Sequence, residues 1–88
     1  MAETWAEEYA AALEAHCGKP FPDDVATAHV VARLLDLARD VAHGSERKNA
    51  PLAAYLAGRY VALRQTDGVD VETALREAES VAKELMGH

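Results

Sequence analysis

Glycine and proline residues divide the chain into four stretches, and this division limits the possible folds more than any other feature. The breaks fall at Gly18 with Pro20, at Gly44 and at Gly68. Within each stretch the apolar residues recur every three or four positions, which is the period of an amphipathic helix. No stretch alternates polar and apolar residues as a strand does. We therefore predict one all-α domain over residues 1–88, with helices over about 4–16, 24–43, 51–65 and 70–86, arranged as a compact four-helix bundle or an orthogonal four-helix array.

Residues that favour helix ends stand at these boundaries. The predicted N-caps are Thr4, Asp23 or Asp24, and Asp70. Gly44 predicts a left-handed turn at the end of the second helix. Pro51 fits the first helical position of the third helix, because its φ is fixed and it has no N–H.

The second helix is predicted to be central, since apolar residues cover more than half of its circumference. Leu35→Ala should then cost about 2–5 kcal/mol. Trp5 and Tyr9 lie on the apolar stripe of the first helix, so we interpret them as core residues rather than a ligand cage. The fourth helix is expected to bury a seam of Val71, Leu75, Ala78, Val81 or Ala82, and Leu85, and to leave Glu72, Glu77, Glu79 and Glu84 outside.

Charge excludes several classes of function. The formal net charge is −6, whereas a nucleic-acid module needs a basic face to displace counterions from phosphate. The acidic N-terminal segment and the lack of a run of 18 apolar residues predict a cytoplasmic protein without a membrane span. The charge is uneven, because residues 25–66 carry six Arg and Lys residues against three acids, between two acidic flanks.

The basic residues gather before the third helix and suggest a candidate site. Its members are Arg39, His43, Arg47, Lys48 and Pro51. A helix N-terminus presents free amides with a partial positive charge, and adjacent cationic side chains suit a phosphate or carboxylate. The alternative is structural, because the same charges complement the dipole of the second helix and keep a connecting loop solvated.

A second candidate surface is the small-residue face of the third helix, formed by Ala54, Gly58 and Ala62. A glycine inside a helix costs about 1 kcal/mol relative to alanine. Close approach by another helix or by a partner would explain Gly58. The other face of this helix carries Leu52, Tyr55, Leu56, Arg59 and Leu63.

Catalytic and metal-binding patterns are weak. Asp40 and His43 have the spacing of an acid–base pair, but Ser45 lacks the surroundings of a nucleophile. The histidines and Cys17 lack the spacing of metal ligands, so we interpret them as packing residues and a small buried thiol. We predict no cofactor, no metal and no catalysis by this domain alone.

The run Leu34–Gly44, followed by Glu46-Arg47, Ala50-Pro51-Leu52, Tyr55-Leu56 and Gly58, resembles a bacterial family of small all-helical domains of unknown function. Members of that family stand alone or follow the nucleotidyltransferase domain of molybdenum cofactor guanylyltransferases. The resemblance covers Val30 to Val61, with Lys48-Asn49 where relatives carry a proline. It implies an accessory role near molybdenum cofactor synthesis, without a known functional residue to transfer.

Two functions follow as expectations. The first is a non-catalytic interaction module that binds a protein partner or itself through the small-residue face and the basic loop. The alternative is a domain that binds a phosphorylated small molecule, such as a nucleotide or pterin phosphate, at the start of the third helix.

Overall fold

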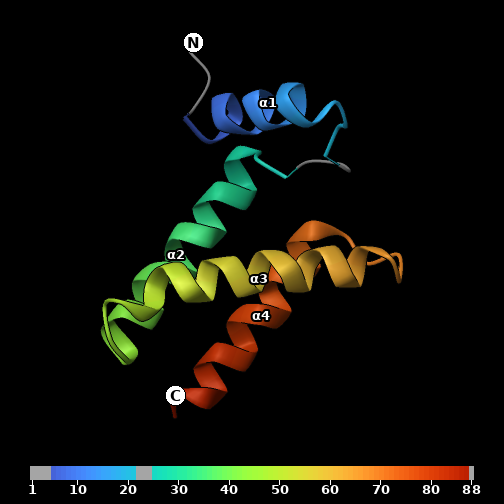
Figure 1. Cartoon of the computed structure of the whole chain (residues 1–88). Helices are drawn as coiled ribbons and strands as arrows, with labels where there is room; N and C mark the ends of the chain where they lie inside the picture. Colours follow the sequence, from blue (N-terminus) through green and yellow to red (C-terminus); the bar gives the residue numbers. More distant parts are fainter. Residues whose placement is uncertain (1–4, 22–24, 88) are drawn as a thin grey trace.

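Four helices form the regular structure of the computed structural model, which describes residues 5–21 and 25–87 (Figure 1). They are α1 (Trp5–Cys17), α2 (Ala28–Gly44), α3 (Asn49–Gln65) and α4 (Val71–Leu85). The described residues contain no strand. The predicted all-α class with four helices is therefore confirmed. The predicted caps Thr4, Asp23 and Asp24 lie outside the described residues.

The second helix begins and ends differently from the prediction. It begins at Ala28, because the Thr27 side chain accepts a hydrogen bond from the Val30 amide at 3.3 Å and acts as the N-cap. Gly44 is the last helical residue and does not have a positive φ, so the predicted left-handed turn is wrong. Ser45 ends the helix instead, since its amide and its hydroxyl both donate to the Val41 carbonyl.

The observed ends of the other helices agree better with the ends predicted from the sequence. Gly18 ends α1 with a φ of +81°, and its amide donates to the Glu14 carbonyl. Pro51 is the third residue of α3 rather than the first, which still lies in the first turn, where an N–H has no helical partner. Asp70 is the N-cap of α4, as predicted, and accepts from the Thr73 amide.

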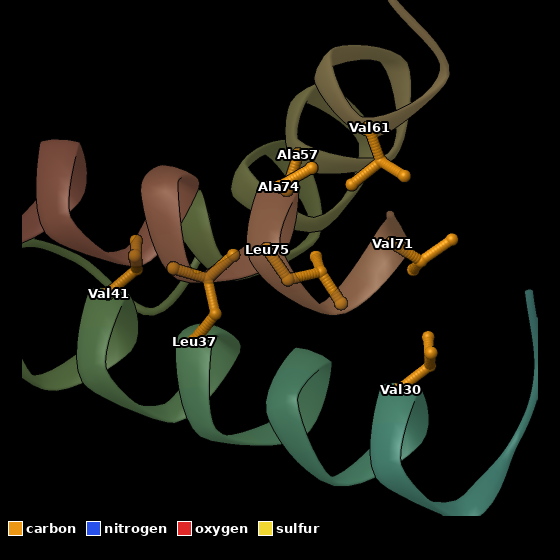
Figure 2. Close-up of a cluster of buried hydrophobic side chains, with 8 residues drawn as sticks. All are labelled: Val30, Leu37, Val41, Ala57, Val61, Val71, Ala74 and Leu75. Carbon is orange, nitrogen blue, oxygen red and sulfur yellow. The ribbon is translucent and has the colours of Figure 1, made fainter. Parts of the chain in front are cut away.

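Helices α2, α3 and α4 form the core. Figure 1 shows α2 and α4 running in the same general direction, with α3 crossing both. Each of the three helices contributes buried side chains (Figure 2), which are Val30, Leu37, Val41, Ala57, Val61, Val71, Ala74 and Leu75. On α3 the buried residues lie one helical turn apart, and the partly buried Ala53 extends the same seam. Small side chains along this seam let α3 pack against two helices at once.

The buried stripe of α2 is narrower than predicted. Leu37 is 3% exposed, whereas Leu35 is 64% exposed, so the burial of Leu35 that the predicted cost of Leu35→Ala requires is absent. The reason is that the described helices pack against only one side of α2, along a stripe that runs from Val30 to Val41. The fourth helix behaves similarly, because its seam continues through Ala82 while Val81 and Leu85 stay exposed.

The first helix contributes no buried residue. It lies at the end of the molecule where α2 begins (Figure 1). Trp5 and Tyr9 stack on each other with ring centroids 4.9 Å apart, but they are 72% and 52% exposed. The prediction that they belong to the core is therefore wrong, because no other described helix covers this side of α1.

Candidate functional site

Among the exposed aliphatic side chains of helices α3 and α4, four border a common surface. Leu52 and Leu56 lie one turn apart on α3, and Val81 and Leu85 lie one turn apart on α4. These residues border two adjoining hollows of about 300 and 510 Å³, which share Ala53, Leu56 and Ala82. We call the two hollows together the α3–α4 groove. Its lining contains no charged residue among those described, so the groove can take up an apolar surface without burying a charge.

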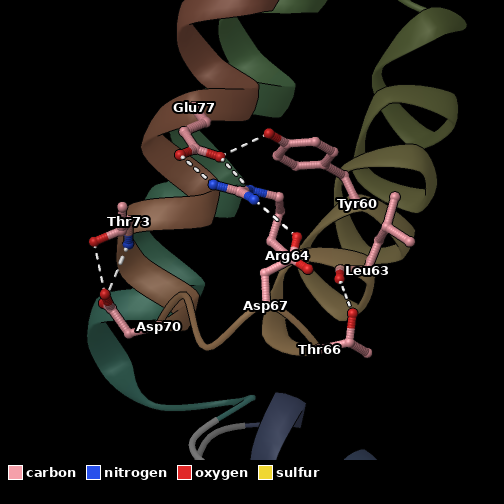
Figure 3. A network of polar contacts seen from close by, with 8 residues as sticks. All are labelled: Tyr60, Leu63, Arg64, Thr66, Asp67, Asp70, Thr73 and Glu77. Atoms are coloured by element: carbon pink, nitrogen blue, oxygen red, sulfur yellow. Dashed lines mark hydrogen bonds and ion pairs between the residues drawn. The ribbon is translucent and has the colours of Figure 1, made fainter.

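A polar cluster closes the other end of the contact between the same two helices (Figure 3). The Tyr60 hydroxyl donates to Glu77 Oε1 at 2.6 Å, and Arg64 Nε donates to the same oxygen at 3.0 Å. A second Arg64 nitrogen, Nη1, donates to Asp67 at 2.9 Å. We call Tyr60, Arg64 and Glu77 the polar clasp. It connects α3 to α4 beside the turn that joins them.

The clasp shifts the titration of its members. Hydrogen bonds from Arg64 and then Tyr60 hold the pKa of the Glu77 carboxyl below its usual value. The hydrogen bond to Glu77 raises the pKa of the Tyr60 hydroxyl, because ionised Tyr60 would lose its proton donor and face a carboxylate. The same carboxylate raises the pKa of the Arg64 guanidinium. At neutral pH Glu77 and Arg64 are therefore ionised and Tyr60 keeps its proton, so every hydrogen bond of the clasp has its donor.

Further ion pairs connect α2 to α4. Arg33 lies between Glu72 and Glu79, at 3.6 and 3.2 Å. Together with the clasp, these contacts engage three of the four glutamates that the sequence placed outside. They lie outside the apolar seam, as predicted, but they are not free, because basic residues of α2 and α3 reach the acidic borders of that seam. Only Glu84 lacks a side-chain partner among the described residues of this set.

The predicted basic site is only partly assembled. His43 lines a hollow of about 510 Å³ with Asp40 and Lys83 of α4. Arg39 does not line this hollow and pairs with Asp36 at 2.7 Å. Among the other predicted members, Lys48 pairs with Glu46 at 3.5 Å, and both Arg47 and Pro51 are exposed. The structure thus brings His43 to a lysine that sequence reasoning missed and keeps Arg39 away from it.

The amides at the start of α3 already have acceptors. The Asn49 amide donates to the Glu46 carbonyl at 2.9 Å, and the Ala50 amide donates to the Arg47 carbonyl at 3.1 Å. Pro51 has no N–H. An anion at this helix end would therefore compete with bonds inside the loop, and the geometry does not favour anion binding here.

The predicted small-residue face is open. Gly58 and Ala62 are exposed, and a Cβ placed on Gly58 would meet no described heavy atom within 4 Å. Close approach by another described helix of the chain therefore does not explain Gly58. Together with Phe21, Val25 and other apolar residues, these positions line a small hollow of about 250 Å³ on the α2 side of α3. Ala54 lies on the same helix and is half-buried.

Residues with metal-binding or nucleophilic side chains do not gather. Within residues 5–21 and 25–87, no group of three His, Cys, Asp or Glu side chains could hold a metal ion. Cys17 is exposed with a free thiol, and His16, His29 and His43 are exposed. Their predicted burial is wrong, because α1, which carries His16 and Cys17, has no buried residue, and His29 and His43 lie outside the buried stripe of α2. No described helix combines the length and the apolar character that crossing a lipid bilayer requires.

Sequence reasoning did not find the clasp or the groove. Tyr60 and Arg64 lie one turn apart on α3, and Glu77 lies on the next helix, so a signal existed in this spacing. This spacing does not identify the clasp, since a sequence does not distinguish a glutamate that bridges two helices from one that faces solvent. Leu52 and Leu56 were recognised as part of one face of the third helix, but their exposure depends on how α3 is rotated about its axis relative to its neighbours.

Comparison with known proteins identifies the family of the chain. Residues 1–88 match the family described as Domain of unknown function (DUF6457). No curated protein matches, and no solved structure matches. The chain belongs to the DUF6457 family.

Proposed function

We propose that this member of the family is a non-catalytic interaction module whose binding surface is the α3–α4 groove. One observation carries the proposal: four large aliphatic side chains border an uncharged groove and remain 58–87% exposed. Exposed apolar residues that occur singly need no explanation, but a contiguous set marks an interaction site. The surface differs from the Ala54, Gly58 and Ala62 face that the sequence suggested.

The arrangement fits an interaction between helices. Leu52 and Leu56 form a ridge along α3, and Val81 with Leu85 forms a second ridge along α4. Ridges of this spacing pack into the grooves of another helical surface. The bottom of the groove is part of the packed core, because Leu37, which lines it, is only 3% exposed. A partner would therefore meet a preformed surface.

Photocrosslinking in the cells that make the protein tests this function. The chain with Leu56→p-benzoylphenylalanine should form a covalent adduct with a protein under ultraviolet light, because the partner covers that position. Leu35→p-benzoylphenylalanine is the matched control, since Leu35 is equally exposed, at 64% against 63%, but lies on α2 outside the groove. Adducts from neither position, or equal adducts from both, would contradict the proposal.

Two further proposals come from the sequence. The link to molybdenum cofactor synthesis depends on the resemblance, and calorimetric titration of the domain with a molybdenum cofactor guanylyltransferase would test it. Phosphate binding at His43, Arg47 and Lys48 is the alternative function. It predicts amide shifts confined to residues 43–52 when inorganic phosphate is added, and a spectrum without shifts would remove it.

A further inference from the structure

The charges beside the α3–α4 groove indicate what occupies it. Arg59 lies one turn after Leu56 on α3, and Glu84 lies one turn after Val81 on α4, so both exposed side chains stand on the outer borders of the two ridges. Neither side chain makes a hydrogen bond or ion pair among the described residues. The ridge of α3 therefore has a free cation beside it, and the ridge of α4 has a free anion beside it.

We propose that a second copy of this chain occupies the α3–α4 groove, with Arg59 of each copy facing Glu84 of the other. The inference rests on the proposed function and names its partner. In a two-fold contact, residue i of one copy meets residue j of the other and the reverse holds too. A surface with a free cation on one ridge and a free anion on the other is complementary to a second copy of itself. In the dimer, Arg59 of each copy pairs with Glu84 of the other.

The net charge of the chain supports the choice of this face for self-association. At −6, two copies repel each other over most of their surfaces. The groove lining carries no charge among the described residues, so two copies can meet there without opposing like charges. The ridges of α3 and α4 in one copy would then pack against the same ridges in the other, which completes a layer of four helices.

Sedimentation equilibrium of the full chain over a wide concentration range tests the proposal. We expect the mass to rise from 9.5 kDa toward twice that value. Leu56→Asp should abolish the dimer, because it places a charge in the apolar contact, and the matched control Leu35→Asp should leave the dimer intact. Circular dichroism verifies that each variant is folded.

Charge reversal tests the orientation. Arg59→Glu and Glu84→Arg should each weaken dimerisation by roughly tenfold or more, because like charges then face each other twice per dimer. The double variant Arg59→Glu with Glu84→Arg should recover most of the loss. The pairing would be overturned if neither single variant dimerises more weakly than the wild type. It would also be overturned if the loss of dimer affinity in the double variant equals the sum of the two single losses.

The two proposals fail differently. A wild-type chain that stays monomeric at millimolar concentration would overturn the second copy as the partner. If Leu56→p-benzoylphenylalanine then crosslinks to a different protein, the proposed function stands. If the position crosslinks to nothing, both are overturned.

Discussion

The two ends of the contact between α3 and α4 are built from different chemistry. At the end near the connecting turn, Tyr60, Arg64 and Glu77 close the contact with directed hydrogen bonds. At the other end, Leu52, Leu56, Val81 and Leu85 leave it open. Tyr60 stands at the boundary, since its ring lines the groove while its hydroxyl belongs to the clasp. The comparison shows that a helix pair can be held at one end so that its other end stays available.

The largest expected effect tests whether the open end still rests on a tight core. Leu37→Ala should lower the free energy of unfolding by about 2–5 kcal/mol, because Leu37 is buried beneath the groove and its removal leaves a cavity. Leu35→Ala, two residues away and exposed, should change it by about 0.5 kcal/mol or less. Urea unfolding followed by circular dichroism measures both. Similar losses would mean that the groove has no packed floor.

The second effect concerns the closed end. Glu77→Ala removes the shared acceptor of Tyr60 and Arg64, so it should lower the urea midpoint by less than Leu37→Ala does. Glu8→Ala on α1 is the control, since Glu8 is exposed and makes no interaction among the described residues. High salt should reduce the effect of Glu77→Ala, because salt screens exposed ion pairs. A midpoint equal to that of the control would show that the clasp does not hold the helices.

Acid should weaken the closed end selectively. The pKa of Glu77 is lowered by Arg64 and that of Asp70 by its hydrogen bonds with Thr73. The unfolded chain therefore takes up protons first as the pH falls through about 4, and stability present above that pH is lost below it. Glu77→Gln should lose less of its free energy of unfolding than the wild type does between pH 5 and pH 3. Parallel pH profiles would contradict a lowered pKa at Glu77.

The smallest expected effect lies between the two ends. Gly58→Ala should raise the free energy of unfolding by about 0.5–1 kcal/mol, because alanine restricts the unfolded chain and favours the helix. The added Cβ meets no described atom within 4 Å, and the φ of Gly58 is not positive. Thermal unfolding of the two proteins measures the gain. A loss of stability instead would show that a neighbour needs the space at Gly58.

Local signals in the sequence predicted most of the fold. The number of helices, the stop at Gly18 and the cap at Asp70 follow from short-range chemistry, and each is present in the structure. The start of α2 was missed because Asp23, Asp24 and Thr27 are all suitable caps. Choosing among them requires knowledge of where α2 meets its neighbours.

Which apolar residues are buried could not be predicted, for a physical reason. Helix α2 carries enough apolar residues for two stripes, and α3 buries Ala57 and Val61, which belong to neither face singled out from the sequence. The periodicity of one helix gives its possible stripes, but the choice among them depends on the other helices. The groove and the clasp arise from that choice, since both combine residues of two helices.

The exposed aromatic stack of α1 determines what an optical signal reports. Trp5 is the only tryptophan of the chain, and it stacks on Tyr9 in a helix that has no buried residue. Its fluorescence therefore senses the state of the first helix, while the ellipticity of the backbone senses all four. Unfolding curves recorded by the two methods should not coincide, even if α2, α3 and α4 unfold in a single cooperative step.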